Sequence, residues 1–187
     1  MKFYLVEVRQ TTRGPKIIVS RSHPGLLRKL LELEIPEVRE GIIEIREIVR
    51  ESGVRAKVAV STLDPNVDPV GACIGNAGAR IKSISKELGG ERIDVVVWSS
   101  DPLIFIRNAL SPARVLKVEP VLEQERAVQV FVRPDHLSLA IGKAGQNVRL
   151  AARLTKWKID IKVLEPEKLP TLQDLFDELI NPEEVES

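Results

Sequence analysis

A five-residue pattern, Ile-Gly-x-Ala-Gly, occurs twice in this chain of 187 residues. The copies are Ile74-Gly75-Asn76-Ala77-Gly78 and Ile141-Gly142-Lys143-Ala144-Gly145. A short apolar stretch precedes each copy, a longer amphipathic stretch follows it, and a β-branched strand pattern closes both. Self-similarity of this kind indicates two copies of one structural unit. We therefore expect an α+β chain that contains two related domains.

Each copy lies in the same order of predicted elements, which is helix, strand, strand, helix, helix, strand. The first unit opens with a helix near Pro24, and Asp101 is placed to cap the helix that opens the second unit. The apolar side of the first helix is expected to carry Leu26, Leu27, Leu30, Leu31 and Leu33. The other expected elements are strands at 42–50, 54–60, 92–97, 114–118, 127–132 and 158–163, and helices at 79–88, 102–110 and 146–154.

Two further strand patterns, at residues 3–8 and 16–20, precede the first unit and flank a turn at residues 12–15. A two-stranded hairpin is marginally stable alone, so this one is expected to pack against something else. The expected division of the chain is a hairpin at 1–20, a first unit at 21–98, a second unit at 99–165 and an acidic tail at 166–187.

The repeated loop has the chemistry of a phosphate clamp. Two glycines three residues apart remove side chains where the chain turns between helices, so a sugar-phosphate backbone can approach the main chain. The helix that follows presents free N–H groups and the positive end of its dipole, which favour anions. Lys143 adds a charge inside the second loop, and Arg80, Lys82, Arg149 and Arg153 are placed to flank the loops.

Other interpretations of the same residues stay open. A Gly-x-x-Gly sequence can be a plain tight turn between packed helices, although two copies in matching contexts favour a binding role. Aliphatic residues beside the loops could form a groove for bases or could simply be core. These residues are Val70, Ile74, Ile81, Leu137, Ile141 and Val148.

The charge distribution favours a polyanionic partner for the two units. Residues 1–163 hold 27 basic and 19 acidic residues, whereas residues 164–187 hold one basic and eight acidic residues. A basic body with an acidic tail is typical of nucleic-acid binding, or of a solvated surface with an acidic terminus. The single cysteine, Cys73, excludes a disulfide framework and favours a reducing, cytoplasmic setting. We expect neither a membrane span nor a signal peptide.

The αββααβ order of both units resembles the type II KH fold. The segments at 68–75 and 139–151 resemble the paired KH domains of the NusA family of bacterial transcription termination/antitermination factors. Residues 1–20 resemble the last two strands of the S1 domain, an OB-type barrel, that precedes these modules in that family. The rest of that barrel and the polymerase-binding N-terminal domain of that family are absent from this sequence, which leaves RNA polymerase and other elongation factors as candidate partners only.

The resemblance implies a monomeric protein that binds single-stranded nascent RNA and modulates transcriptional pausing, termination and antitermination. Alternatives are a ribosome-associated KH protein and a KH appendage of an RNA-processing complex. The first loop is expected to be the weaker electrostatic clamp, because it has Asn76 in place of Lys143 and Asp64 and Asp68 precede it. The predicted RNA-binding residues are Ile74, Gly75, Asn76, Ala77, Gly78, Arg80, Lys82, Ile141, Gly142, Lys143, Ala144, Gly145, Gln146, Asn147, Arg149 and Arg153.

Catalysis, cofactors and metals are not expected. Residues 64–68 imitate the start of a calcium loop, but Pro69 and Gly75 stand where that loop needs glycine and glutamate. Neither a Walker sequence nor a dinucleotide-binding glycine pattern occurs. His23 and His136 are expected at the surface or as helix caps. Residues 172–180 have the pattern of a short amphipathic helix or of a frayed acidic terminus.

Overall fold

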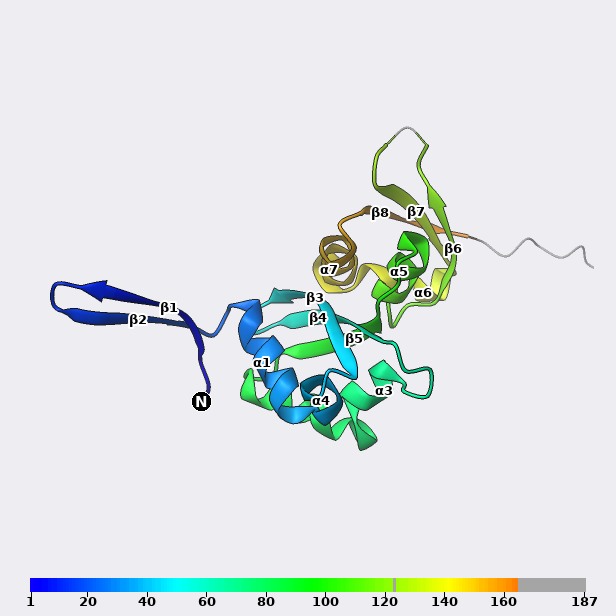
Figure 1. Cartoon of the computed structure of the whole chain (residues 1–187). Coiled ribbons are helices and arrows are strands. Elements are labelled where there is room, and N and C mark those ends of the chain that lie inside the picture. The colour runs from blue at the N-terminus through cyan, green and yellow to red at the C-terminus, as the bar shows by residue number, and fades with distance from the viewer. Residues whose placement is uncertain (123, 165–187) are drawn as a thin grey trace, which may run out of the picture.

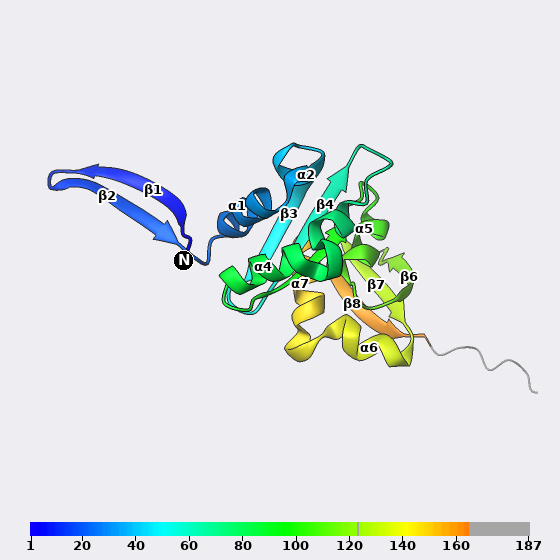
Figure 2. The same ribbon diagram turned by 90° about the horizontal axis from the view of Figure 1, so that it is seen from below.

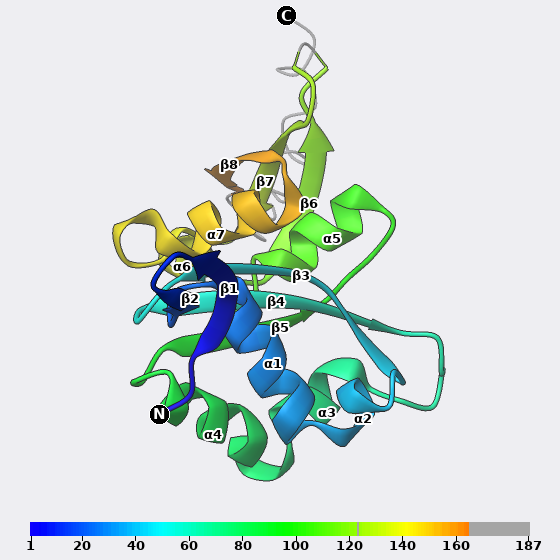
Figure 3. The same cartoon turned by 60° about the vertical axis from the view of Figure 1, so that its left-hand side comes forward.

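The computed structural model describes residues 1–122 and 124–164. Its elements form a projecting hairpin and two α+β units, with the second unit stacked on the sheet of the first (Figure 1). When the molecule is turned, the helices α5 (Pro102–Ala109) and α7 (Gln146–Thr155) are seen between the two sheets (Figure 3).

The first unit has helices on one face of a three-stranded sheet with the order β3-β4-β5. The central strand β4 is antiparallel to β3 and parallel to β5. Its elements are α1 (Pro24–Glu34), α2 (Pro36–Arg39), β3 (Ile43–Glu51), β4 (Arg55–Thr62), α3 (Pro69–Ile74), η1 (Asn76–Gly78), α4 (Ala79–Glu87) and β5 (Arg92–Val97). The predicted αββααβ order is confirmed, with the short helix α2 as an addition that the sequence patterns did not predict.

The second unit repeats this arrangement with the sheet order β6-β7-β8, in which β7 is antiparallel to β6 and parallel to β8. Its elements are α5, β6 (Val115–Pro120), β7 (Ala127–Val132), α6 (Pro134–Ile141), η2 (Lys143–Gly145), α7 and β8 (Lys158–Val163). The predicted cap is confirmed, because Asp101 Oδ1 accepts from the backbone N of Leu103 at 2.8 Å and of Ile104 at 3.3 Å.

The buried side of α1 is narrower than predicted. Leu26, Leu27, Leu30 and Leu31 are at most 2% exposed, whereas Leu33 is 59% exposed. At about 100° per residue, Leu33 lies at the edge of the stripe formed by the other four leucines, roughly 90° from its centre. The prediction that Leu33 faces the core is therefore wrong.

The two units share one hydrophobic cluster. Val49, Ala59 and Val96 from the first sheet join Phe105 of α5 and Leu150 of α7 in it, all of them buried. Burying apolar area in this way contributes about 25 cal/mol per Å². The linker between β5 and α5 is therefore not the only connection between the units.

A buried charge also crosses this interface. Lys57 is fully buried in β4, and its Nζ donates to the carbonyl of Ser111 in the second unit at 3.0 Å. The same Nζ lies 3.2 Å from Asp94 Oδ2. Burial lowers the pKa of Lys57 to about 8, and the Asp94 carboxylate opposes that shift.

The hairpin of β1 (Tyr4–Thr11) and β2 (Gly14–Ser20) projects away from both units (Figure 2). Its apolar side chains Leu5, Val8, Ile17 and Val19 are each more than 50% exposed. Contact with the first unit is made at its base, where the Tyr4 ring stacks on the His23 ring with 4.5 Å between centroids. The described residues therefore leave most of the hairpin uncovered.

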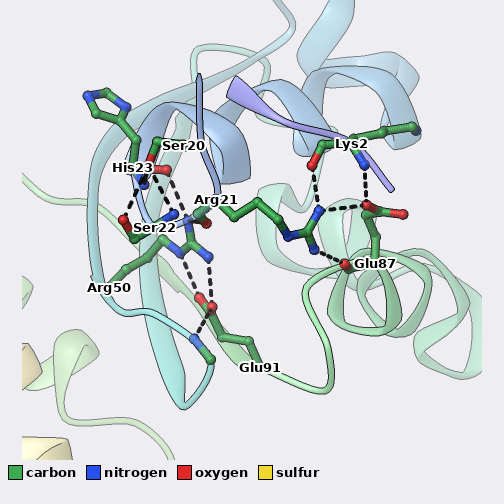
Figure 4. A network of polar contacts seen from close by, with 9 residues as sticks. Lys2, Ser20, Arg21, Ser22, His23, Arg50, Glu87 and Glu91 are labelled. Atoms are coloured by element: carbon green, nitrogen blue, oxygen red, sulfur yellow. Dashed lines mark hydrogen bonds and ion pairs between the residues drawn. The ribbon is translucent and has the colours of Figure 1, made fainter. Parts of the chain in front are cut away.

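A polar network holds the segment between the hairpin and α1 to the first unit (Figure 4). Arg50 Nε and Nη2 donate to the two carboxylate oxygens of Glu91, each at 2.7 Å, and both side chains are almost completely buried. Arg50 Nη1 also donates to the carbonyls of Arg21 and His23. Glu91 accepts a further bond from the backbone N of Gly53 at 2.8 Å.

In the part of the chain that the structure describes, no helix has the length and apolar character that crossing a membrane requires. The amphipathic helix expected at residues 172–180 lies outside the described residues.

Candidate nucleic-acid interface

The two glycine loops have the same backbone conformation. Gly75 has φ 74° and ψ 172°, and Gly142 has φ 76° and ψ 169°. A Cβ on Gly142 would lie 2.8 Å from the backbone N of Asn147, and a Cβ on Gly75 would lie 2.8 Å from Cγ of Arg80. Both the positive φ and the close approach require glycine at the first position of each loop.

The two alanines are also in matching, unusual conformations. Ala77 (φ 51°, ψ 24°) and Ala144 (φ 51°, ψ 34°) lie in the left-handed region, which costs a residue with a Cβ about 1 kcal/mol. The second glycines, Gly78 and Gly145, are left-handed as well. This repeated conformation turns the chain sharply between two helices, and the small residues leave the loop backbone without bulky side chains.

The helices that follow the loops begin without a side-chain cap. Gly78 and Gly145 occupy the N-cap positions of α4 and α7, and neither offers a side chain to the first-turn N–H groups. By contrast, the helix α3 is capped by Asp68 through the backbone N of Val70 at 3.1 Å. An uncapped helix start after an exposed loop is suited to accept an anion.

A cation is held against each loop at the equivalent position. Lys82 Nζ donates to the carbonyl of Ala77 at 2.8 Å, and Arg149 Nη1 donates to the carbonyl of Ala144 at 3.2 Å. Both side chains come from the helix after the loop, one turn from its start. Lys143 is exposed in the second loop, Arg153 is exposed two turns along α7, and Asn76 is exposed in the first loop.

Two of the predicted cations are already paired with carboxylates. Arg80 Nη1 lies 2.9 Å from Glu37 Oε2 and also donates to the carbonyl of Ala72 at 2.7 Å. Arg149 Nε lies 2.8 Å from Glu51 Oε1. Sequence reasoning did not identify either glutamate, because Glu37 belongs to the unpredicted helix α2 and Glu51 comes from the other unit.

Asn147 does not belong among the residues that can contact RNA. It is fully buried, and its Nδ2 donates to the carbonyls of Leu110, Leu139 and Ala140 at 3.0–3.2 Å. Asn147 and Arg80 occupy equivalent positions after the two loops, and both bond the carbonyls at the end of the preceding helix. The sequence reveals the position but not its burial, so the prediction of RNA contact is corrected to a structural role.

Replacing Asn147 with alanine is expected to lower the free energy of unfolding by about 1–3 kcal/mol, because the buried carbonyls of Leu110 and Ala140 would lose a donor. Denaturant unfolding measures this change. Unchanged stability together with weakened RNA binding would contradict the structural role. That result would instead support direct contact between Asn147 and RNA.

The aliphatic residues beside the loops are divided by exposure. Ile74 and Ile141 are each 37% exposed immediately before the glycines. The others, Val70, Ile81, Leu137 and Val148, are half-buried and pack against the two hydrophobic clusters. Ile74 and Ile141 are therefore the better placed of the six to touch a base.

Each histidine accepts a hydrogen bond from a backbone amide. Nδ1 of His23 accepts from the backbone N of Gly25 at 3.0 Å and caps α1, and Nδ1 of His136 accepts from the backbone N of Arg114 at 3.1 Å. Across residues 1–122 and 124–164, no three His, Cys, Asp or Glu side chains are grouped to hold a metal ion.

Both units match family models. The model described as the NusA-like first KH domain matches residues 21–98, and the NusA-like second KH domain matches residues 102–168. The crystal structure of APE1850 is similar in fold, with a TM-score of 0.54 and 24% identity, and the match covers 74% of this chain and 97% of that one.

Curated relatives are more similar in sequence. The transcription termination/antitermination protein NusA of Bacillus subtilis is 56% identical over 162 residues, or 87% of this chain and 43% of that protein. The NusA proteins of Halalkalibacterium halodurans and Thermus thermophilus are 53% and 52% identical over 93% and 88% of this chain, which are 46% and 42% of their own lengths. The chain thus spans less than half the length of these relatives.

Proposed function

Because this chain belongs to the NusA family, whose paired KH domains it carries, we propose that it binds single-stranded RNA and acts in transcriptional pausing, termination and antitermination. Nascent RNA is the proposed ligand, since a regulator of transcription meets the transcript as it is made. RNA polymerase and other elongation factors are proposed as further partners. The proposed activity is binding, with no catalytic step.

The observation that carries this proposal is the duplicated loop. Each loop offers a left-handed turn without bulky side chains, an uncapped helix start and a cation against its carbonyl. A KH loop clamps about four nucleotides of backbone, so two loops would engage about eight. Phosphates would lie against the loops, and bases would lie toward Ile74 and Ile141.

The charges near the loops set the expected strength of this clamp. Lys82, Lys143 and Arg153 are exposed, and no ion pair involves any of them within the described part of the chain. Arg149 keeps half of its side chain exposed despite its bond to Glu51. About three phosphate contacts are therefore proposed, shared unequally between the two loops.

Affinity for an unstructured 12-nucleotide RNA is expected to fall about 20-fold between 50 and 200 mM salt, for about three released counterions at a slope near −0.7 each. Fluorescence anisotropy titrations at four salt concentrations give the slope. A duplex of the same length is the control and should bind more weakly, because its paired bases cannot lie against Ile74 and Ile141. An affinity that does not change with salt would rule out phosphate contacts as the main source of RNA affinity.

A further inference from the structure

Glu51, from the first unit, lies at the start of the helix that follows the second loop. It is the last residue of β3, and its side chain is 23% exposed. Its Oε2 accepts from Nε2 of Gln146 at 3.0 Å and from Nη2 of Arg149 at 3.1 Å, and its Oε1 accepts from Nε of Arg149 at 2.8 Å. A carboxylate from one unit is thus placed beside the phosphate-binding loop of the other.

The surroundings of Glu51 keep it ionised. Hydrogen bonds from Arg149 and then Gln146 lower the pKa of the Glu51 carboxyl to about 2, and the charge of Arg153 acts in the same direction. Its bond to Arg149 also raises the pKa of that guanidinium. At neutral pH both partners are therefore fully charged, and the pair is a bidentate ion pair of the kind that arginine also forms with phosphate.

Arg149 is the residue for which two anions would compete. A guanidinium has five N–H donors. Nε and Nη2 of Arg149 each donate to Glu51, and Nη1 donates to the carbonyl of Ala144 in the loop. The Nε/Nη2 edge, one of the two that can bind a carboxylate or phosphate at two points, is therefore occupied by Glu51. The half-exposed side chain remains within reach of a ligand at the loop.

The first loop has no such competitor. Lys82, at the position equivalent to Arg149, donates to the loop carbonyl of Ala77 but forms no ion pair among the described residues. Glu37, which pairs with the residue that follows the helix start after that loop, is bonded to Arg80 and not to Lys82. The carboxylate beside the loop-bound cation is thus a feature of the second loop.

We propose that Glu51 sets the affinity of the second loop for RNA, because its carboxylate competes with RNA phosphate for Arg149. The inference rests on the proposed RNA-binding function. Because phosphate at the Nε/Nη2 edge would replace one anion with another, its contact there contributes little net affinity. Phosphate contacts are the same for every sequence. Competition by Glu51 therefore weakens the binding of every RNA alike and leaves the preference between bases unchanged.

The test compares Glu51→Gln with Glu47→Gln in the whole chain. Both substitutions remove one negative charge from β3, and both break an ion pair to α7. Glu47, however, pairs with Lys156 at 3.3 Å, at the end of α7 away from the loop. Binding of 12-nucleotide oligo-A, oligo-C and oligo-U RNA is measured at several salt concentrations for the original protein and both variants.

Glu51→Gln is expected to tighten binding of all three RNAs by about 3- to 10-fold and to steepen the salt slope by about 0.7, the value for one added phosphate contact on a single strand. The ratio between the best and worst of the three RNAs should stay the same, because a phosphate contact is the same for every sequence. Glu47→Gln should change the slope by much less. Equal changes in both variants would overturn the proposal, since overall charge alone would explain them, and weaker binding of Glu51→Gln would overturn it too.

A further variant, Arg149→Gln, tests whether the effect of Glu51→Gln acts through Arg149 and not through a change in folding. If Glu51 occupies Arg149 in the original protein, Arg149→Gln should weaken RNA binding by less than about 3-fold but should abolish the gain produced by Glu51→Gln. A large loss from Arg149→Gln in the original protein would show that phosphate already holds this residue, which overturns the proposal. If the original protein binds none of the RNAs, that result contradicts the proposed RNA-binding function itself. It is therefore distinguishable from the outcomes that contradict the role of Glu51.

Discussion

Replacing Lys143 and Ala144 with aspartate is expected to weaken binding of single-stranded RNA by about 100-fold. The change removes a charge-assisted bond, worth about 1.5–3 kcal/mol, and adds two anions where a phosphate would lie. Both residues are exposed. Ala144 has φ 51°, a region that aspartate adopts more readily than alanine, so the fold should persist. Anisotropy titration measures the loss, and circular dichroism confirms the fold.

The matched change in the first loop, Asn76→Asp with Ala77→Asp, is expected to cost less, about 10-fold. Only the second pair of substitutions removes a lysine, so Asn76→Lys completes the comparison and should strengthen binding. The sequence suggests a larger difference in affinity loss between the two loops than the structure does. The reason is that Glu51 already pairs with Arg149 of the second unit. If the first pair costs more and Asn76→Lys has no effect, base contacts rather than charge dominate in the first unit.

Replacing Glu91 with alanine is expected to lower the free energy of unfolding by about 3–5 kcal/mol, because it leaves the Arg50 guanidinium buried without its carboxylate. The Arg50 side chain is 2% exposed, and both of its bonds to Glu91 are 2.7 Å long. The backbone N of Gly53 would also lose its acceptor. Denaturant unfolding followed by circular dichroism measures the loss.

Glu87→Ala is the control for this prediction. Glu87 also pairs with an arginine in the same network, since Arg21 Nη1 lies 3.1 Å from its Oε1 (Figure 4). Its side chain is 27% exposed, so solvent screens the pair and the loss should be much smaller. The double variant Arg50→Met, Glu91→Leu should recover part of the stability, because it removes both buried charges together. Equal losses from Glu91→Ala and Glu87→Ala would show that burial of the ion pair is unimportant.

Local sequence patterns were sufficient to predict the repeated units, the order of their elements and the loops. These features are local: apolar periodicity predicts a helix or strand within one segment, and Gly75 and Gly142 mark turns that only glycine can make. The cap at Asp101 was predictable for the same reason, since a cap bonds amides two and three residues away. Comparing the two loops residue by residue also identified the cations that lie against them.

Which of those residues remain accessible to RNA depends on how the chain packs in three dimensions. Asn147 and Arg80 hold equivalent positions, but Asn147 is fully buried against carbonyls of its own unit, whereas Arg80 is partly exposed beside Glu37. Glu51 and Arg149 are 98 residues apart, and only the stacking of the second unit on the first sheet brings them to 2.8 Å. Burial and long-range ion pairs depend on how distant surfaces meet, and no local pattern in the sequence encodes that meeting.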